Sequence, residues 1–200
     1  MSQTFAMPTL VDALRPAPFA LDHSVSRRAA YNIALMLGGV ALIALAAQLE
    51  IRLAISPVTI TGQTFAVLLV GALFGAKRGA AAVIAYLALG ATGAPVFAGG
   101  AGGAAWFVSH TGGYLIGFIA AAFVTGLLAE RGWDRRPHTT AAAMLLGLAA
   151  LYVPGLLWLS LFVGWETVFA VGFVPFMPGC AMKVALATAL MPLAWKIVGR

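Results

Sequence analysis

The fold class is decided by residues 27–48, RRAAYNIALMLGGVALIALAAQ, in which two arginines precede an apolar run without a charged side chain. A membrane-spanning helix needs about 20 mainly apolar residues to cross a hydrocarbon core of ~30 Å. The run from Ala29 to Gln48 has that length and is longer than the apolar core of a cleavable signal peptide. We therefore expect a first transmembrane helix that is not removed by cleavage.

Composition extends this prediction to the whole chain. Of the 200 residues, 62% are hydrophobic and only 9% are charged, whereas soluble domains carry about 25% charged residues. The formal net charge of +6 would suit nucleic acid in a soluble protein. Here the basic residues lie in short gaps between apolar runs, which indicates a lipid bilayer and no nucleic acid. A single cysteine, Cys180, excludes an intrachain disulfide and any CxxC pair.

Six apolar runs are long enough to be considered as spans, at residues 29–48, 64–75, 80–92, 114–129, 141–163 and 179–198. The second and third runs have only about a dozen residues each, too few to cross the bilayer as helix alone. Their outer flanks must then complete the crossing as irregular, partly re-entrant backbone. Such backbone is tolerated only against protein or beside a polar cavity. A locally thinner bilayer is the alternative explanation.

Basic residues are confined almost entirely to alternate gaps. If six spans begin with the N-terminus inside, ten of the twelve basic residues lie on the cytoplasmic side: Arg15, Arg27, Arg28, Lys77, Arg78, Arg131, Arg135, Arg136, Lys196 and Arg200. We therefore predict an all-α, multi-pass protein of the inner (plasma) membrane with both termini in the cytoplasm. Residues 1–28 would form a flexible cytoplasmic tail, and residues 29–200 a single six-helix transmembrane domain.

The long outer connections hold the candidate binding residues. The connection at residues 94–113 has six glycines and no Asp, Glu, Lys or Arg, which is unusual for a solvated loop. Glycines let backbone approach a ligand closely, but they also serve helix packing, and both explanations remain open for this loop. The candidates in and beside it are Phe97, Gly99, Gly100, Gly102, Gly103 and Thr111.

Polar side chains within the spans supply the remaining candidates. Lys183 enters the last span from the outer side, where it either holds an anionic or carbonyl group or extends to the headgroups. Cys180 lies three residues earlier on the same helical face. The hydroxyl of Tyr86, in the third span, either lines the cavity or bonds a neighbouring helix. No metal-ligand cluster, catalytic motif or GxxxxGK[ST] loop occurs, so we expect no metal, no cofactor and no ATPase or other enzymatic activity.

Four ordered motifs carry a resemblance to a known family: PVTITGQT (57–64), GALFGAKRG (71–79), GAPVFAGG (93–100) and TGGYLIGF (111–118). They resemble the BioY family, along most of the chain from about Ala29 to Lys196. The resemblance implies a six-helix S component of an energy-coupling factor (ECF) transporter, which captures biotin from outside. It also implies a transmembrane T component and two ATP-binding subunits as partners. In such proteins an AxxxA motif of the first helix docks on the T component, and Ala30 with Ala34 matches it.

One position departs from the family pattern. The family commonly has PGDxxK at the start of the last helix, whereas residues 178–183 here read PGCAMK. Lys183 matches, but Cys180 replaces an aspartate, and a thiol accepts hydrogen bonds only weakly. Backbone carbonyls of the glycine-rich loop or the hydroxyl of Tyr86 can instead accept from the ureido ring. A membrane protein with a purely structural or assembly role and an intramembrane enzyme are the alternative functions.

Overall fold

The computed structural model describes residues 7–14 and 25–198. Its long helices are α3 (Val25–Ala47), α4 (Gln63–Phe74), α5 (Ala76–Ala91), α7 (Gly112–Ala129), α8 (Pro137–Val163) and α10 (Met177–Val198). The short elements are α1 (Leu10–Ala13), β1 (Glu50–Ile51), β2 (Ile60–Thr61), η1 (Ala98–Gly100), α6 (Ala105–Val108), η2 (Trp133–Arg135), α9 (Val168–Gly172) and η3 (Val174–Phe176). Over the described residues the structure is thus all-α apart from one two-residue antiparallel pairing of β1 with β2.

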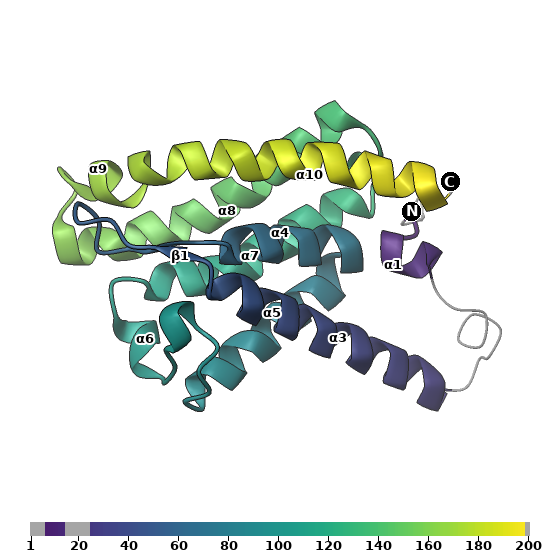
Figure 1. Cartoon of the computed structure of the whole chain (residues 1–200), viewed down its shortest axis with the longest axis horizontal. Coiled ribbons are helices and arrows are strands. Elements are labelled where there is room, and N and C mark those ends of the chain that lie inside the picture. The colour runs from purple at the N-terminus through teal and green to yellow at the C-terminus, as the bar shows by residue number, and fades with distance from the viewer. Residues whose placement is uncertain (1–6, 15–24, 199–200) are drawn as a thin grey trace, which may run out of the picture.

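Four stretches of the described residues are long and apolar enough to cross a membrane: Ser26–Ala47, Gly112–Ala129, Pro137–Val163 and Val168–Val198. With 12 and 16 residues, α4 and α5 are the shortest of the long helices, in agreement with the short second and third spans predicted from the sequence. In Figure 1 the segments with α6, α9 and β1 lie at one end of the bundle, and α1 and the C-terminus lie at the other. We call these the loop end and the α1 end.

Helix α7 forms the centre of the bundle. In its apolar 18-residue window 67% of the residues are buried, compared with 17% in α3. It packs against α4, α5 and α8, and small residues let the backbones approach closely. A Cβ added at Gly71 of α4 would lie 2.4 Å from the carbonyl oxygen of Ala122, and one at Gly117 would lie 2.6 Å from that of Leu151. Both contacts therefore require glycine.

The connection between α4 and α5 is very short. Helix α5 begins at Ala76, and the chain reverses at Gly75 with φ of +87°. The side chain of Glu130, just after α7, accepts a hydrogen bond of 2.9 Å from the amide of Ala76. This carboxylate caps the start of α5, where a negative charge is favourable.

Part of the predicted flexible tail is packed against the α1 end. Leu10 is 5% exposed, the guanidinium of Arg78 donates to Asp12 at 2.9 Å, and the hydroxyl of Tyr31 donates to the carbonyl of Val11 at 2.7 Å. For residues 7–14 the expectation of a flexible tail is therefore corrected, because this segment buries a leucine and pairs its carboxylate with Arg78. Residues 25–28 of the predicted tail belong to α3, and residues 1–6 and 15–24 lie outside the described residues.

The charge of Asp12 is stabilised where it lies. Burial acts to raise the pKa of its carboxyl group, but hydrogen bonds from Arg78 and Thr9 and the charge of Arg78 lower it, and the net pKa is below the ordinary 3.8. This ion pair therefore contributes stability above pH 3.8. The contribution is lost as the pH falls through the lowered pKa.

We predict that Gly71→Ala lowers the stability of the protein by about 1–3 kcal/mol, because the added methyl group meets backbone atoms of Ala122. The matched control is Gly38→Ala on α3, where nothing lies within 4 Å of an added Cβ. That variant should be neutral or stabilised by up to about 1 kcal/mol. Thermal unfolding in detergent measures both, and equal midpoints for the two variants would contradict the packing described here.

We predict that Asp12→Asn speeds amide hydrogen exchange in residues 9–14 at neutral pH, because it removes the ion pair to Arg78. The difference from wild type should shrink as the pH falls below the lowered pKa of Asp12, where the wild-type carboxyl group is protonated as well. Exchange of α7 amides serves as the internal control. A difference between the two proteins that does not change with pH would argue against the ion pair.

Candidate ligand-binding site

A cavity of about 70 Å³ lies at the loop end, between the first turns of α4 and α7 and the chain around residue 97. The cavity is lined by Val58, Thr59, Thr61, Gln63, Thr64, Phe97, Ala98, Trp106, Thr111, Tyr114, Leu115, Phe118, Leu151, Tyr152 and Phe176.

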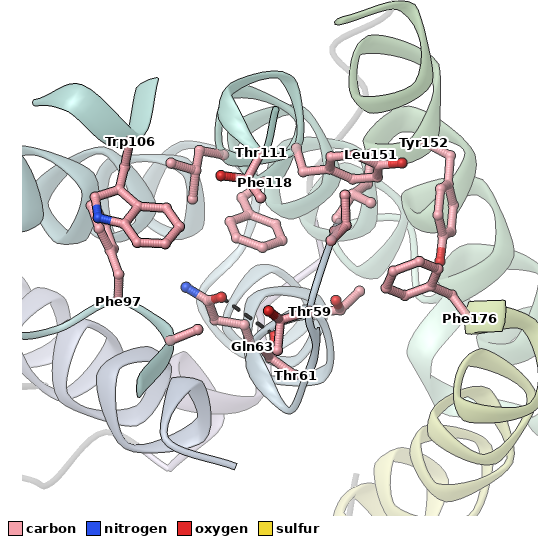
Figure 2. Close-up of a pocket in the computed structure, with 15 residues that line it drawn as sticks. Thr59, Thr61, Gln63, Phe97, Trp106, Thr111, Phe118, Leu151, Tyr152 and Phe176 are labelled. Carbon is pink, nitrogen blue, oxygen red and sulfur yellow. Dashed lines mark hydrogen bonds between the residues drawn. The ribbon is translucent and has the colours of Figure 1, made fainter. Parts of the chain in front are cut away.

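Aromatic rings form two opposite walls of the cavity. Figure 2 shows Phe97 and Trp106 on one side and Tyr152 and Phe176 on the other. Edge-to-face contacts hold the rings: the centroid of Phe97 lies 6.2 Å from that of Phe107. No charged side chain is among the described residues that line the cavity. These walls suit an apolar ligand body.

The polar groups of the cavity are concentrated on residues 59–64, which carry the side chains of Thr59, Thr61, Gln63 and Thr64. This segment is held by the pairing of β1 with β2 and by a 2.9 Å hydrogen bond from the amide of Gly62 to the carbonyl of Leu49. Glycine is required at position 62, because an added Cβ would lie 2.7 Å from the carbonyl oxygen of Ala46. Strand β2 thus passes directly into α4 and presents its polar side chains to the cavity.

Two of the residues predicted from the sequence, Phe97 and Thr111, line the cavity itself. Phe97 is 3% exposed, and its ring meets the Tyr86 ring edge-on at 5.6 Å. The hydroxyl of Thr111, just before α7, lies 2.9 Å from the hydroxyl of Ser109. The two residues come from opposite ends of the glycine-rich connection, so that connection forms one side of the cavity.

Tyr86 and Cys180 lie one layer behind the lining. The Gln63 amide donates a short hydrogen bond to the Tyr86 hydroxyl, which answers the question left open by the sequence, because Tyr86 bonds a neighbouring helix and does not line the cavity. The thiol of Cys180 lies 3.2 Å from the hydroxyl of Tyr152. Each of the two therefore holds a residue that does line the cavity.

Lys183 also lies behind the lining and is partly buried. Its ammonium group donates a 2.7 Å hydrogen bond to the backbone carbonyl of Thr61. Within the described part of the chain it forms no ion pair with a carboxylate. Lys183 thus places a cation beside residues 59–64, and two of its three N–H donors remain available.

Four glycines predicted to contact a ligand are not among the residues that line the cavity: Gly99, Gly100, Gly102 and Gly103. An added Cβ at Gly99 would lie 2.7 Å from the guanidinium of Arg52. The amide of Gly103 donates to the carbonyl of Gly90 at 2.7 Å. Both glycines adopt a positive φ, so the conformation of the loop explains them without a ligand.

Sequence reasoning missed Gln63 and Tyr152 as cavity residues. A glutamine at the start of an apolar span is the signal for the first, since an amide there requires partners. Tyr152 within α8 gives the same signal, because a buried hydroxyl also requires a partner, and its hydroxyl lies 3.2 Å from the thiol of Cys180. Which side of each helix faces the cavity depends on packing, which the sequence pattern does not define.

The predicted docking residues, Ala30 and Ala34, lie near the start of α3 and are both exposed. A spacing of four residues places them on the same face of the helix. The start of α3 lies away from the loop end (Figure 1), and none of the described residues covers this face. It is therefore accessible to another protein within the membrane.

Known proteins show strong similarity to this chain. The BioY family matches residues 19–200. A probable biotin transporter BioY of Pyrococcus horikoshii is 39% identical, covering 70% of this chain and 83% of the relative. The biotin transporter BioY of Thermotoga maritima is 42% identical, covering 73% and 85%.

A solved structure agrees with the sequence comparisons. The crystal structure of the S component for biotin from an ECF-type ABC transporter superposes with a TM-score of 0.74 at 26% identity. The match covers 86% of this chain and 95% of the solved one. The overall fold is therefore similar to that of a known S component, and this chain belongs to the BioY family.

Proposed function

We propose that this protein is a substrate-binding subunit for biotin uptake, an S component that binds biotin in the cavity at the loop end. Biotin has a polar ureido ring, an apolar body and a carboxylate on a flexible chain. The cavity offers polar side chains on residues 59–64, aromatic walls, and the ammonium group of Lys183 close by. This combination of neutral and cationic groups supports the proposal, together with the names of the relatives.

The environment of the Lys183 ammonium group is the single observation that supports biotin as the ligand. A partly buried ammonium group with one carbonyl partner is poorly compensated, because desolvation of its charge is offset by only one hydrogen bond. A ligand carboxylate or ureido oxygen would supply the missing acceptor. We propose that Lys183, which contacts the lining residue Thr61 from outside the lining, fixes the β2 segment through Thr61 and reaches the biotin molecule when the ligand is bound.

We propose six membrane crossings, with α4 and α5 completed by the segments that flank them at the loop end. The loop end would face outward, and the α1 end, which carries most of the basic residues, would face the cytoplasm of the inner membrane. A T component and two ATP-binding subunits would drive the delivery of biotin inward. The exposed face with Ala30 and Ala34 would dock on the T component.

We predict that Lys183→Met weakens biotin binding to the purified protein by roughly ten- to hundredfold, because a hydrogen bond to a charged group is lost. The matched control is Lys196→Met near the other end of α10, where the side chain is exposed. It should bind like wild type. Isothermal titration calorimetry in detergent measures both. Unchanged function of Lys183→Met, with no biotin bound by wild type, would instead support a structural or assembly role.

We predict that the double variant Ala30→Leu/Ala34→Leu loses co-purification with the T component and ATP-dependent biotin uptake, because the larger side chains prevent close helix contact. Biotin binding by the isolated subunit should be unchanged. Ala189→Leu, at an exposed position on α10, is the matched control and should assemble normally. Normal uptake by the double variant would show that α3 docks through another face.

A further inference from the structure

We propose that Gln63 is the residue that recognises the ureido ring of the ligand, and that Tyr86 positions its amide group. The inference rests on the proposed function, since it takes biotin as the ligand. It addresses the question raised by Cys180, which the family resemblance places at an aspartate position. The structure shows another group able to accept a hydrogen bond from a ureido N–H.

The hydrogen bonds around Tyr86 define which way the Gln63 amide points. The Tyr86 hydroxyl has one proton, which it donates to the backbone carbonyl of Val96 at 2.9 Å. Its oxygen can then only accept, so the atom of Gln63 that meets it must be the amide nitrogen Nε2. The orientation of the amide thus follows from the network and does not depend on distinguishing nitrogen from oxygen.

With its nitrogen held by Tyr86, Gln63 keeps both kinds of hydrogen-bonding group for a ligand. One N–H is used, and the second is available as a donor. The oxygen Oε1 receives only a long 3.4 Å contact from the hydroxyl of Thr61 and retains acceptor capacity. A cyclic urea presents an N–H beside a C=O, which is the complement of a primary amide. Gln63 lines the cavity and is 5% exposed, so water competes little for these groups.

Tyr86 acts through Gln63 and does not reach the ligand. It is fully buried, with 0% exposure, and is not among the cavity-lining residues. Its ring is held edge-on against Phe97, and its hydroxyl is held by the carbonyl of Val96. A fixed acceptor of this kind reduces the conformational freedom that Gln63 would otherwise lose on binding.

Cys180 does not compete for this role. Its thiol lies beside the Tyr152 hydroxyl, behind the cavity lining, and thiols form weak hydrogen bonds. The two candidates also come from different elements, Gln63 from α4 and Cys180 from α10. Gln63 belongs to the segment that also holds the hydroxyl groups of Thr59, Thr61 and Thr64, all of which line the cavity.

The test is a double-mutant cycle on biotin affinity of the purified protein, measured by calorimetry. Gln63→Met should weaken binding roughly ten- to hundredfold, and Tyr86→Phe roughly three- to tenfold. In the Gln63→Met background, Tyr86→Phe should cost less than twofold, because its effect passes through Gln63. Tyr31→Phe, which removes a partly buried hydroxyl contact at the α1 end, is the matched control and should bind like wild type.

A change of ligand preference separates recognition from a purely structural effect. Gln63→Glu should shift the affinity ratio toward 2-iminobiotin, whose ring is a guanidinium cation, at least tenfold relative to biotin. Wild-type affinity in Gln63→Met, an equal cost of Tyr86→Phe in both backgrounds, or an unchanged ratio in Gln63→Glu would each overturn the inference. If wild type binds no biotin, the proposed function fails. If wild type binds biotin and the Gln63→Met variant binds it equally well, only the proposed role of Gln63 fails.

Discussion

The structure depends on one constraint: the backbone at both ends of α4 and α5 must find hydrogen-bond partners without help from lipid. With 12 residues, α4 is too short to cross alone, and residues 48–62 continue it as non-helical chain. Several groups of that segment are paired. The β1–β2 bridge holds it at Thr61, Lys183 holds the Thr61 carbonyl, and the hydroxyl of Ser56 donates to Val171 at 2.7 Å.

The same pairings create the cavity. Segments that cannot pack as helices leave space between the first turns of α4 and α7, and their side chains become its lining. Lys183 lies behind the lining, where it donates to the backbone carbonyl of Thr61. The described side chains that line the cavity carry no charge. This arrangement separates two tasks. Buried groups such as Tyr86 and Cys180 orient side chains, and the side chains of Gln63 and Tyr152 face the cavity.

The other helices provide a rigid frame for this irregular part. Close contacts at Gly71 and Gly117 bring α4 and α8 against α7 with backbone-to-backbone packing. Such contacts tolerate little movement, because no side chain lies between the helices to repack. By contrast, α3 is largely exposed and is tied at the α1 end by Tyr31 and Val11. A helix with a largely open surface is thus the one proposed to meet the partner subunit.

The sequence alone determined the membrane class, the alternation of charged gaps, the two short apolar runs and the family resemblance, and it predicted Phe97 and Thr111, which line the cavity. These follow from length, hydropathy and motif order, which are properties of neighbouring residues. Only the tertiary structure decided that Gln63 faces the cavity while Tyr86 lies behind it, and that the glycines from Gly99 to Gly103 shape a loop. Glycine shows the same pattern whether it meets a ligand or another backbone. The partner of a buried hydroxyl comes from residues far away in the chain, so packing alone selects it.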